Sequence, residues 1–197
     1  MLFDLSAVPQ GFEYRPDFVS ADEERALLEA IERLEFSKVE MRGAVARRRT
    51  VHYGWSYGYE RRQAQPGEPI PDFLLAVRQR AADWAELPAE AFAEALITDY
   101  PEGAPIGWHR DAPMFDEIAG ISLGAACRMK FRPYMPPSAL PALTAPRRTT
   151  HQIELAARSA YLIRGVARRE YEHSIPPVDG HRYSVTFRTM KAVRTSR

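Results

Sequence analysis

The chain has 197 residues, of which 45% are hydrophobic and 27% are charged, as expected for one globular domain of moderate size. A net charge of +1 is too small to create an overall electrostatic potential that would require a polyanionic partner. No apolar run is long enough to span a bilayer. The single cysteine, Cys127, excludes an internal disulfide. Because MLFDLSAVPQ also lacks the pattern of a secretory signal, we expect a cytoplasmic protein.

The first half of the chain is expected to hold the helices. Ser20 and Glu23 have capping-box spacing, which predicts a helix that begins at Ser20. Its buried stripe would consist of apolar residues at helical intervals, namely Leu27, Leu28, Ile31 and Leu34. Residues 36–59 alternate loosely and indicate surface hairpins. A second helix, capped by Asp72, would bury Phe73, Val77, Ala81 and Trp84, and a third short helix fits residues 88–95.

From Leu96 onward the pattern changes to short strands separated by turns rich in proline and glycine. Strands that follow helices indicate an α+β domain in which the strands form a sandwich or barrel. The last strand alternates between an apolar face (Tyr183, Val185, Phe187) and a polar face (Arg182, Ser184, Thr186, Arg188). The polar face either lines the barrel or simply meets water, as in many antiparallel sheets.

Three residues have the composition of a metal site. His109 and Asp111 stand at H-x-D spacing on an expected strand, so that both side chains point to the same face. His173 lies 62 residues beyond Asp111. Two histidines and one carboxylate form the facial triad of non-haem Fe(II) oxygenases, which leaves three coordination positions open. The H-x-D pair alone is a weak signal, and a histidine such as His173, taken alone, is more often structural than a metal ligand.

Two arginines downstream strengthen the signal. Arg182 follows His173 after nine residues, and Arg188 follows after six more, on the same face of the expected last strand. Their backbones would lie about 20 Å apart at about 3.3 Å per residue, and long side chains can close much of that gap. Because a guanidinium binds a carboxylate through two hydrogen bonds, the pair could hold a short dicarboxylate inside a barrel.

The segments IGWHRD, YEHSIPPV and RYSVTFR resemble the AlkB-like family of 2-oxoglutarate and Fe(II)-dependent dioxygenases, and PDFVSADEERALL is similar to the family's entry into the first helix. The resemblance implies a double-stranded β-helix, or jelly-roll barrel, with supporting N-terminal helices. It implies a single domain over residues 1–197, with helices and a substrate lid in 1–95 and the catalytic barrel in 96–190.

The resemblance also implies the cofactors and their ligands. The metal Fe(II) would be bound by His109, Asp111 and His173, with 2-oxoglutarate as cosubstrate and O2 as oxidant. Arg182 would hold the distal carboxylate of 2-oxoglutarate and Arg188 the carboxylate near the metal. Tyr100 matches a tyrosine that hydrogen-bonds the cosubstrate. Thr98 stands where the repair enzymes usually carry asparagine, and its hydroxyl can still donate a hydrogen bond.

A second departure concerns the substrate. Pro113, four residues after His109, stands where DNA-repair members often carry an acid that contacts the exocyclic amine of adenine or cytosine. Proline cannot make that contact, which counts against direct repair of methylated adenine or cytosine. The histidines His52, His151 and His181 lack ligand spacing and are expected to be structural or to lie at the surface.

The substrate region of the family corresponds to residues 40–62. The segment from Arg42 to Arg62 contains six arginines and a single acidic residue, and aromatic residues lie among the arginines. This mixture suits a flipped or single-stranded base, so Trp55, Tyr57 and Arg48 are the expected substrate-binding residues. The alternatives are that the aromatics fill the core under a hairpin and that the arginines face solvent.

The function that this reading favours is oxidative demethylation of alkylated nucleobases in DNA or RNA, by a monomer without membrane contact. Two alternatives stay open. The same centre could hydroxylate or demethylate a protein or a small molecule. A non-catalytic metal- or nucleic-acid-binding module is the alternative of another class, although a mere binder has no need of a carboxylate clamp beside its metal.

Overall fold

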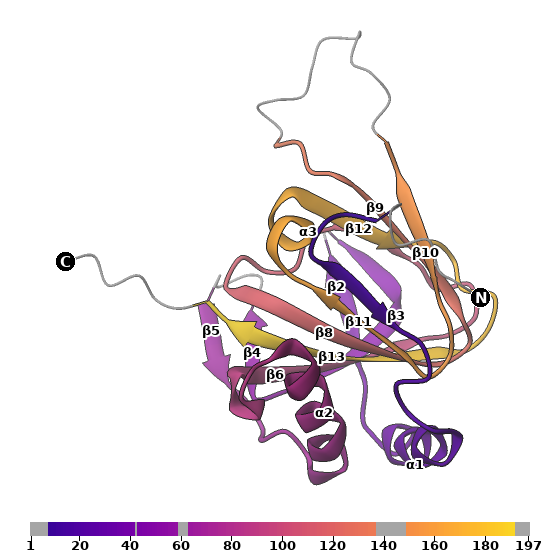
Figure 1. Ribbon diagram of the computed structural model, residues 1–197. Helices are drawn as coiled ribbons and strands as arrows, with labels where there is room; N and C mark the ends of the chain where they lie inside the picture. Colours follow the sequence, from indigo (N-terminus) through magenta and orange to yellow (C-terminus); the bar gives the residue numbers. More distant parts are fainter. Residues whose placement is uncertain (1–7, 42, 59–62, 137–148, 192–197) are drawn as a thin grey trace, which may run out of the picture.

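Two antiparallel sheets face each other in the computed structural model, which describes residues 8–41, 43–58, 63–136 and 149–191 (Figure 1). Within these residues the larger sheet has seven strands, in the order β1-β11-β8-β13-β6-β3-β2. Their bounds in that order are Phe12–Arg15, Ser159–Ile163, Phe115–Gly124, Arg182–Met190, Phe92–Tyr100, Ala44–Tyr53 and Ser37–Met41.

The smaller sheet has the order β10-β9-β12-β7, and a separate pair is formed by β4 and β5. The strands of the smaller sheet are His151–Leu155, Cys127–Pro133, Tyr171–Ile175 and Ile106–His109, and those of the pair are Trp55–Gly58 and Gln63–Pro66. A short helix, α3 (Gly165–Glu170), joins β11 to β12. This is the jelly-roll barrel that the family resemblance implies.

The first helix, α1 (Ala21–Ile31), begins where the sequence predicts. The Ser20 side chain accepts a hydrogen bond from the Glu23 amide, and the Glu23 carboxylate accepts one from the Ser20 amide. Leu27 and Ile31 are buried, and Leu28 and Leu34 pack against the same core. The capping box therefore fixes the start of the helix, and the spacing of the apolar residues sets the face that it buries.

Two expectations for the following helices are wrong. The second helix begins as a 3-10 turn, Asp72–Leu74, before α2 (Leu75–Ala85), and no side chain caps either element, so Asp72 is not the cap. Residues 88–95 do not form a helix, because only the turn Ala89–Ala91 precedes β6. The backbone of β6 pairs with both β13 and β3, and these long-range hydrogen bonds override the local helix propensity of alanine and glutamate.

Residues 36–59 contribute more than surface hairpins. β3 pairs with β6 inside the larger sheet and carries β2 at its edge, so this part of the chain forms one wall of the barrel. Arg48, Thr50 and His52 share one face of β3 and line the cavity described below. The sequence pattern did not indicate this role, because polar residues occupy both faces of the strand.

The larger sheet separates two cores. On one face the helices pack on the apolar side of the sheet, where Ile97 of β6, Ile121 of β8 and Phe187 of β13 share one buried cluster with helix residues such as Val77. Between the sheets lies the second core, which includes Phe12, Ile118, Met129, Phe131 and Ile163. The expected alternation of the last strand is confirmed: Tyr183, Val185 and Phe187 belong to the first core, and its polar face lines the barrel.

Gly120 of β8 lies opposite Tyr161 of β11, and a Cβ at Gly120 would lie 2.1 Å from the phenol ring, so only glycine leaves room for it. Cys127 is buried at the start of β9, and burial raises the pKa of its thiol.

None of the helices in the described part of the chain has the length and apolar character needed to cross a membrane.

Candidate active site

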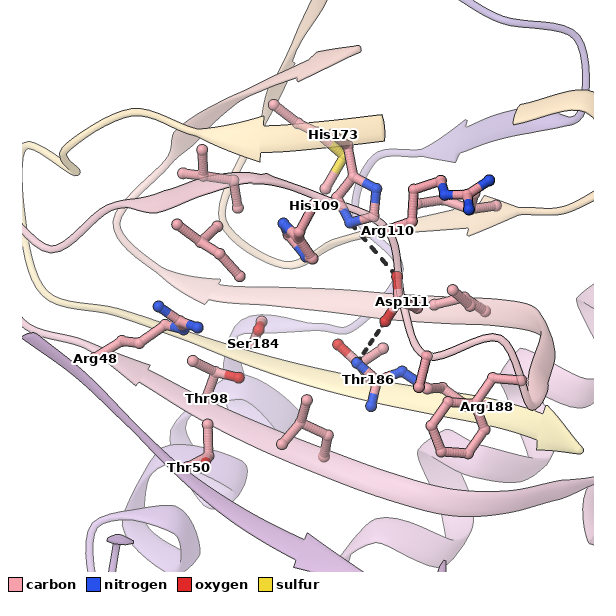
Figure 2. Close-up of a pocket in the computed structure, with 18 of the residues that line it drawn as sticks. Arg48, Thr50, Thr98, His109, Arg110, Asp111, His173, Ser184, Thr186 and Arg188 are labelled. Atoms are coloured by element: carbon pink, nitrogen blue, oxygen red, sulfur yellow. Dashed lines mark ion pairs between the residues drawn. The ribbon is translucent and has the colours of Figure 1, made fainter. Parts of the chain in front are cut away.

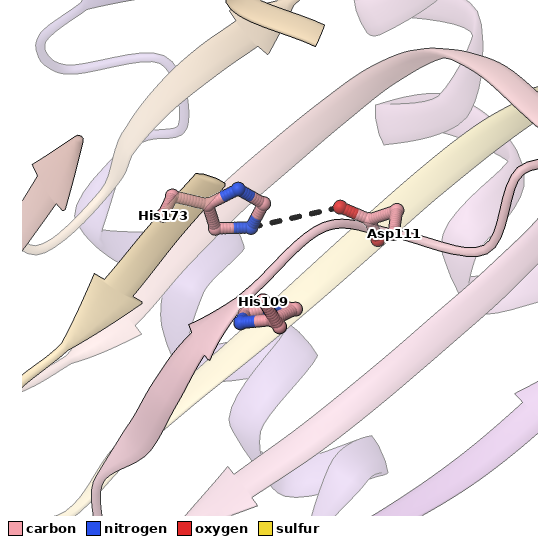
Figure 3. A group of neighbouring side chains, drawn as sticks. All are labelled: His109, Asp111 and His173. Atoms are coloured by element: carbon pink, nitrogen blue, oxygen red, sulfur yellow. Dashed lines mark ion pairs between the residues drawn. The ribbon is translucent and has the colours of Figure 1, made fainter. Parts of the chain in front are cut away.

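The side chains of His109, Asp111 and His173 converge on one another (Figure 3). His109 ends β7, and His173 lies directly opposite it on β12. Asp111 lies two residues beyond the end of β7, in the following turn rather than on a strand as expected. One potential ligand atom from each residue lies within 4.8 Å of the others, which is close enough for a single metal ion to be shared.

The histidines are held in the form that binds metals. The Nδ1 atom of His109 lies 2.8 Å from the carbonyl oxygen of Gly107 and must be the donor, which leaves Nε2 with its lone pair. Burial lowers the pKa of His109, and burial together with the neighbouring His109 lowers the pKa of His173 to about 3. Both rings are therefore neutral at neutral pH and need not lose a proton to coordinate.

Asp111 is held in its ionised form. Its Oδ1 lies 2.6 Å from Nη2 of Arg188, and its Oδ2 lies 3.6 Å from Nε2 of His173. Burial alone would raise the pKa of the carboxyl group, but Arg188, the two neighbouring histidines and Arg168 together outweigh it and hold the pKa well below its usual range. The site therefore offers two neutral nitrogen donors and one charged oxygen donor.

A cavity of about 360 Å³ leads from these residues into the barrel (Figure 2). Its floor is the polar face of β13, namely Arg182, Ser184, Thr186 and Arg188. Thr98 and Tyr100 of β6 line it beside β13, and Arg48 enters from β3. That Thr98 and Tyr100 contact 2-oxoglutarate stays a prediction.

Arg182 is a buried cation that still has donors to offer. Its residue is 0% exposed, its Nε donates to the Ser122 hydroxyl at 3.1 Å, and its guanidinium lies 4.9 Å from the centre of the Tyr100 ring. Among the described residues, neither of its terminal nitrogens has a hydrogen-bond partner. A buried guanidinium in this state calls for an anion in the cavity, and a carboxylate matches its fork.

Arg188 is placed differently. Its Nη1 lies 2.8 Å from the Glu94 carboxylate and its Nη2 contacts Asp111, so both terminal nitrogens face carboxylates of the chain itself. Arg188 thus lies beside the metal triad as expected, and in this arrangement it orients Asp111. Its contact with the metal-proximal carboxylate of 2-oxoglutarate stays a prediction.

Of the three expected substrate residues, the two whose side chains the structure describes are not brought together. Arg48 lines the cavity, whereas Trp55 of β4 is not among its lining residues. The Tyr57 side chain lies outside the part that the structure describes, as do Arg42, Tyr59, Arg61 and Arg62.

Sequence reasoning missed three residues near the site. His52 and Glu94 line the cavity, although neither belongs to a motif. A carboxylate in the otherwise apolar run FAEALI (92–97) was the available signal for Glu94. Arg168 of α3 donates through Nη2 to the carbonyl oxygens of Asp111, Ala112 and Phe115 at 3.3, 2.9 and 2.8 Å. It therefore fastens the turn that carries Asp111 to the helix that precedes His173.

The residues present fit Fe(II) together with a 2-oxo dicarboxylate. A two-histidine, one-carboxylate set on one side of the metal leaves positions open for a chelating cosubstrate and dioxygen. The unsatisfied terminal nitrogens of Arg182 lie deeper in the same cavity and supply a partner for the second carboxylate.

Comparison with known proteins agrees with this chemistry. A family model described as the 2OG-Fe(II) oxygenase superfamily matches residues 11–195. The chain is 27% identical over 181 residues to the Mus musculus tRNA (carboxymethyluridine(34)-5-O)-methyltransferase ALKBH8, covering 88% of this chain and 25% of that protein. It is 27% identical over 191 residues to the Arabidopsis thaliana alkylated DNA repair protein ALKBH8 homolog, covering 89% and 53% respectively. The chain thus spans between a quarter and about half of the length of these relatives.

Solved structures share the fold. OsALKBH1 superposes with a TM-score of 0.69 at 15% identity, covering 92% of this chain and 99% of that one. A Pseudomonas putida prolyl-4-hydroxylase superposes with a TM-score of 0.58 at 16% identity, covering 92% and 94%. At such identities the likeness concerns the jelly-roll barrel alone.

Proposed function

Because the chain belongs to the 2OG-Fe(II) oxygenase superfamily, we propose that it removes alkyl groups oxidatively from nucleobases in DNA or RNA. The enzyme is a dioxygenase that depends on Fe(II), 2-oxoglutarate and O2. The nucleobase substrate and the roles of the individual residues in binding iron and 2-oxoglutarate are what we propose.

In this proposal His109, Asp111 and His173 hold the iron, and Arg182 with Tyr100 orients 2-oxoglutarate. The bound iron and cosubstrate supply the oxidation, in which 2-oxoglutarate becomes succinate and carbon dioxide while a substrate C–H bond is hydroxylated. A hydroxylated N-methyl group then leaves as formaldehyde. The protein excludes water, keeps the two imidazoles neutral and holds Asp111 ionised.

The observation that carries the proposal is the continuity of the cavity from the triad to the wall formed by β3. Arg48, Thr50 and His52 line that space, and Figure 2 shows Arg48 and Thr50 across it from the metal residues. These side chains supply hydrogen-bond donors and acceptors suited to the edge of a planar base. The names of the relatives refer to tRNA and to alkylated DNA, which supports a nucleic acid as the carrier of that base.

The proposal is tested by formaldehyde release from a panel of methylated single-stranded DNA, RNA and tRNA, with Fe(II), ascorbate and 2-oxoglutarate present. We expect release from at least one nucleic acid and none from the His109→Ala variant. Succinate production without formaldehyde or a hydroxylated nucleoside from any nucleic acid would overturn the nucleobase assignment and leave the oxygenase chemistry intact.

Adjacent arginines on β3 provide a matched pair for substrate binding. Arg48 lines the cavity, whereas Arg49 points to the opposite face and pairs with buried Asp99. Binding to a methylated oligonucleotide should weaken in Arg48→Gln much more than in Arg49→Gln. Affinity of the unaltered protein should also fall as salt rises, and a flat salt response would contradict phosphate contacts.

A further inference from the structure

Glu94 is a buried carboxylate that no step of the proposed reaction uses. It lies on β6 with 0% exposure, and both of its oxygens are engaged. Oε2 accepts from Nη1 of Arg188 at 2.8 Å, and Oε1 lies 3.0 Å from Nδ1 of His52. Placing an ionised carboxylate inside a barrel is costly, so these two contacts are needed for it to remain there.

The same arginine joins Glu94 to the metal triad. Arg188 contacts Glu94 through Nη1 and Asp111 through Nη2, so one guanidinium bridges two buried carboxylates. His52 lies at the outer end of this chain, with a side chain 35% exposed on the cavity wall. The sequence of contacts is therefore His52, Glu94, Arg188 and Asp111, running from the β3 wall to the candidate iron ligand.

We propose that Glu94 is a positioning residue for Asp111, acting through Arg188. Its charge offsets that of the guanidinium, so that Asp111 keeps its negative charge available for a divalent cation. With Glu94 the three groups carry a net charge of −1, and without it they are neutral. Its hydrogen bond also fixes the direction in which Arg188 presents Nη2 to Asp111. The inference rests on the assignment of Asp111 as an iron ligand.

Strand β6, which carries Glu94, also contains a natural control. Asp99 is likewise 0% exposed, and it is likewise paired with one arginine and one histidine, Arg49 and His181. Unlike Glu94, it has no contact with Arg188 and does not line the cavity. Glu94→Gln and Asp99→Asn therefore remove equivalent buried charges, and only the former disturbs the chain that ends at Asp111.

The experiment measures Co(II) binding to the purified apoprotein by calorimetry. Because this needs neither turnover nor nucleic acid, its result is independent of the substrate proposal. Glu94→Gln should weaken Co(II) binding by about 10–100-fold, as substitutions behind a metal ligand commonly do. Asp99→Asn should leave the affinity within a few-fold of the unaltered protein, and the two variants should have similar melting temperatures. Unchanged affinity in Glu94→Gln, or an equal loss in Asp99→Asn, would overturn the proposal.

A double-mutant cycle tests whether the effect passes through Arg188. In an Arg188→Met background, Glu94→Gln should cause no further loss of Co(II) affinity, because the charge that Glu94 offsets is gone. The double variant leaves no guanidinium and no Glu94 carboxylate unpaired, so it can be measured even if Glu94→Gln alone folds poorly. An equal loss in both backgrounds would show that Glu94 does not act through Arg188.

Discussion

At the scale of single residues, Arg182 has opposite effects: it lowers the stability of the ligand-free protein and favours the binding of a carboxylate. A buried guanidinium with two unsatisfied terminal nitrogens destabilises the ligand-free protein, and the same nitrogens are what a carboxylate would bind. Replacement by methionine, which has similar reach and no charge, should separate the two effects.

We expect Arg182→Met to melt at or above the temperature of the unaltered apoprotein in calorimetry. The variant should bind 2-oxoglutarate more weakly, with a loss of about 2–5 kcal/mol in binding free energy measured on Mn(II)-loaded protein. This is the usual cost of truncating one partner of a buried charge pair. Unaltered 2-oxoglutarate affinity would remove Arg182 from the cosubstrate site.

Arg168 makes a different kind of contribution. Three carbonyl oxygens of the turn at 111–115 share its Nη2, so one side chain holds the turn that carries Asp111. Arg168→Met leaves those carbonyls without their donor and should cost about 2–3 kcal/mol of unfolding free energy, measured in urea. Arg169→Gln, at the neighbouring exposed position, should cost less than about 0.5 kcal/mol. Equal losses would mean that the contacts of Arg168 are unimportant.

How far the sequence predicts the site depends on whether a residue belongs to a spaced motif. His109, Asp111 and His173 converge as their spacing indicates, and Arg182 faces the cavity as the alternation of the last strand indicates. Glu94 and Arg168 could not be found in this way. Their partners lie more than forty positions away, and such contacts appear only once the strands have paired.

At the scale of elements, α1 and α2 are tied together by one ion pair. The Glu23 carboxylate that completes the capping box also contacts Arg80 of α2, and this contact, with the Ser20 amide, lowers the pKa of Glu23 to about 2. A depressed pKa contributes stability that is present above the ordinary value of 4.5 and is lost as the pH falls from there to about 2.

Glu23→Gln keeps an oxygen for the Ser20 amide and removes the charge. Because both partners are about 40% exposed, solvent weakens the pair, and the variant should be less stable by only about 0.5–1 kcal/mol at pH 7. The difference should disappear near pH 2 in unfolding curves measured across that range. Arg25→Gln, which breaks a more exposed pair with Asp22, should show no such pH-dependent gap.

Local patterns predicted elements well only where local contacts decide them. Ser20 and Glu23 satisfy each other within one turn, so the start of α1 follows from the sequence. The expected helix at 88–95 failed because Phe92 and the residues after it pair with strands that are distant in the sequence. For the same reason β3 could not be assigned to the barrel wall, since its partner β6 lies about forty residues away.

At the scale of the whole molecule, the candidate site joins the two sheets. The metal residues come from β7, its following turn and β12, whereas Arg182 and Arg188 come from β13 of the larger sheet. Ligands that bridge these elements bind the folded chain only, so they should stabilise the entire barrel.

Adding Mn(II) and 2-oxoglutarate at about 100 times their dissociation constants should contribute about 2.7 kcal/mol for each ligand. For a domain of this size each ligand should raise the melting temperature by about 5–10 °C in differential scanning fluorimetry. A chelator should reverse the increase, and the His109→Ala variant should show little of it. The absence of any 2-oxoglutarate effect on metal-loaded protein would contradict a shared site.

The burial of Cys127 has a practical consequence. Since the sole thiol of the chain is enclosed and has a raised pKa, the native protein offers maleimide or nitroxide reagents almost no target. A cysteine introduced at Val45, which is 57% exposed near the start of β3, would then be labelled selectively. A probe there would report directly whether the β2–β3 hairpin moves when an oligonucleotide arrives.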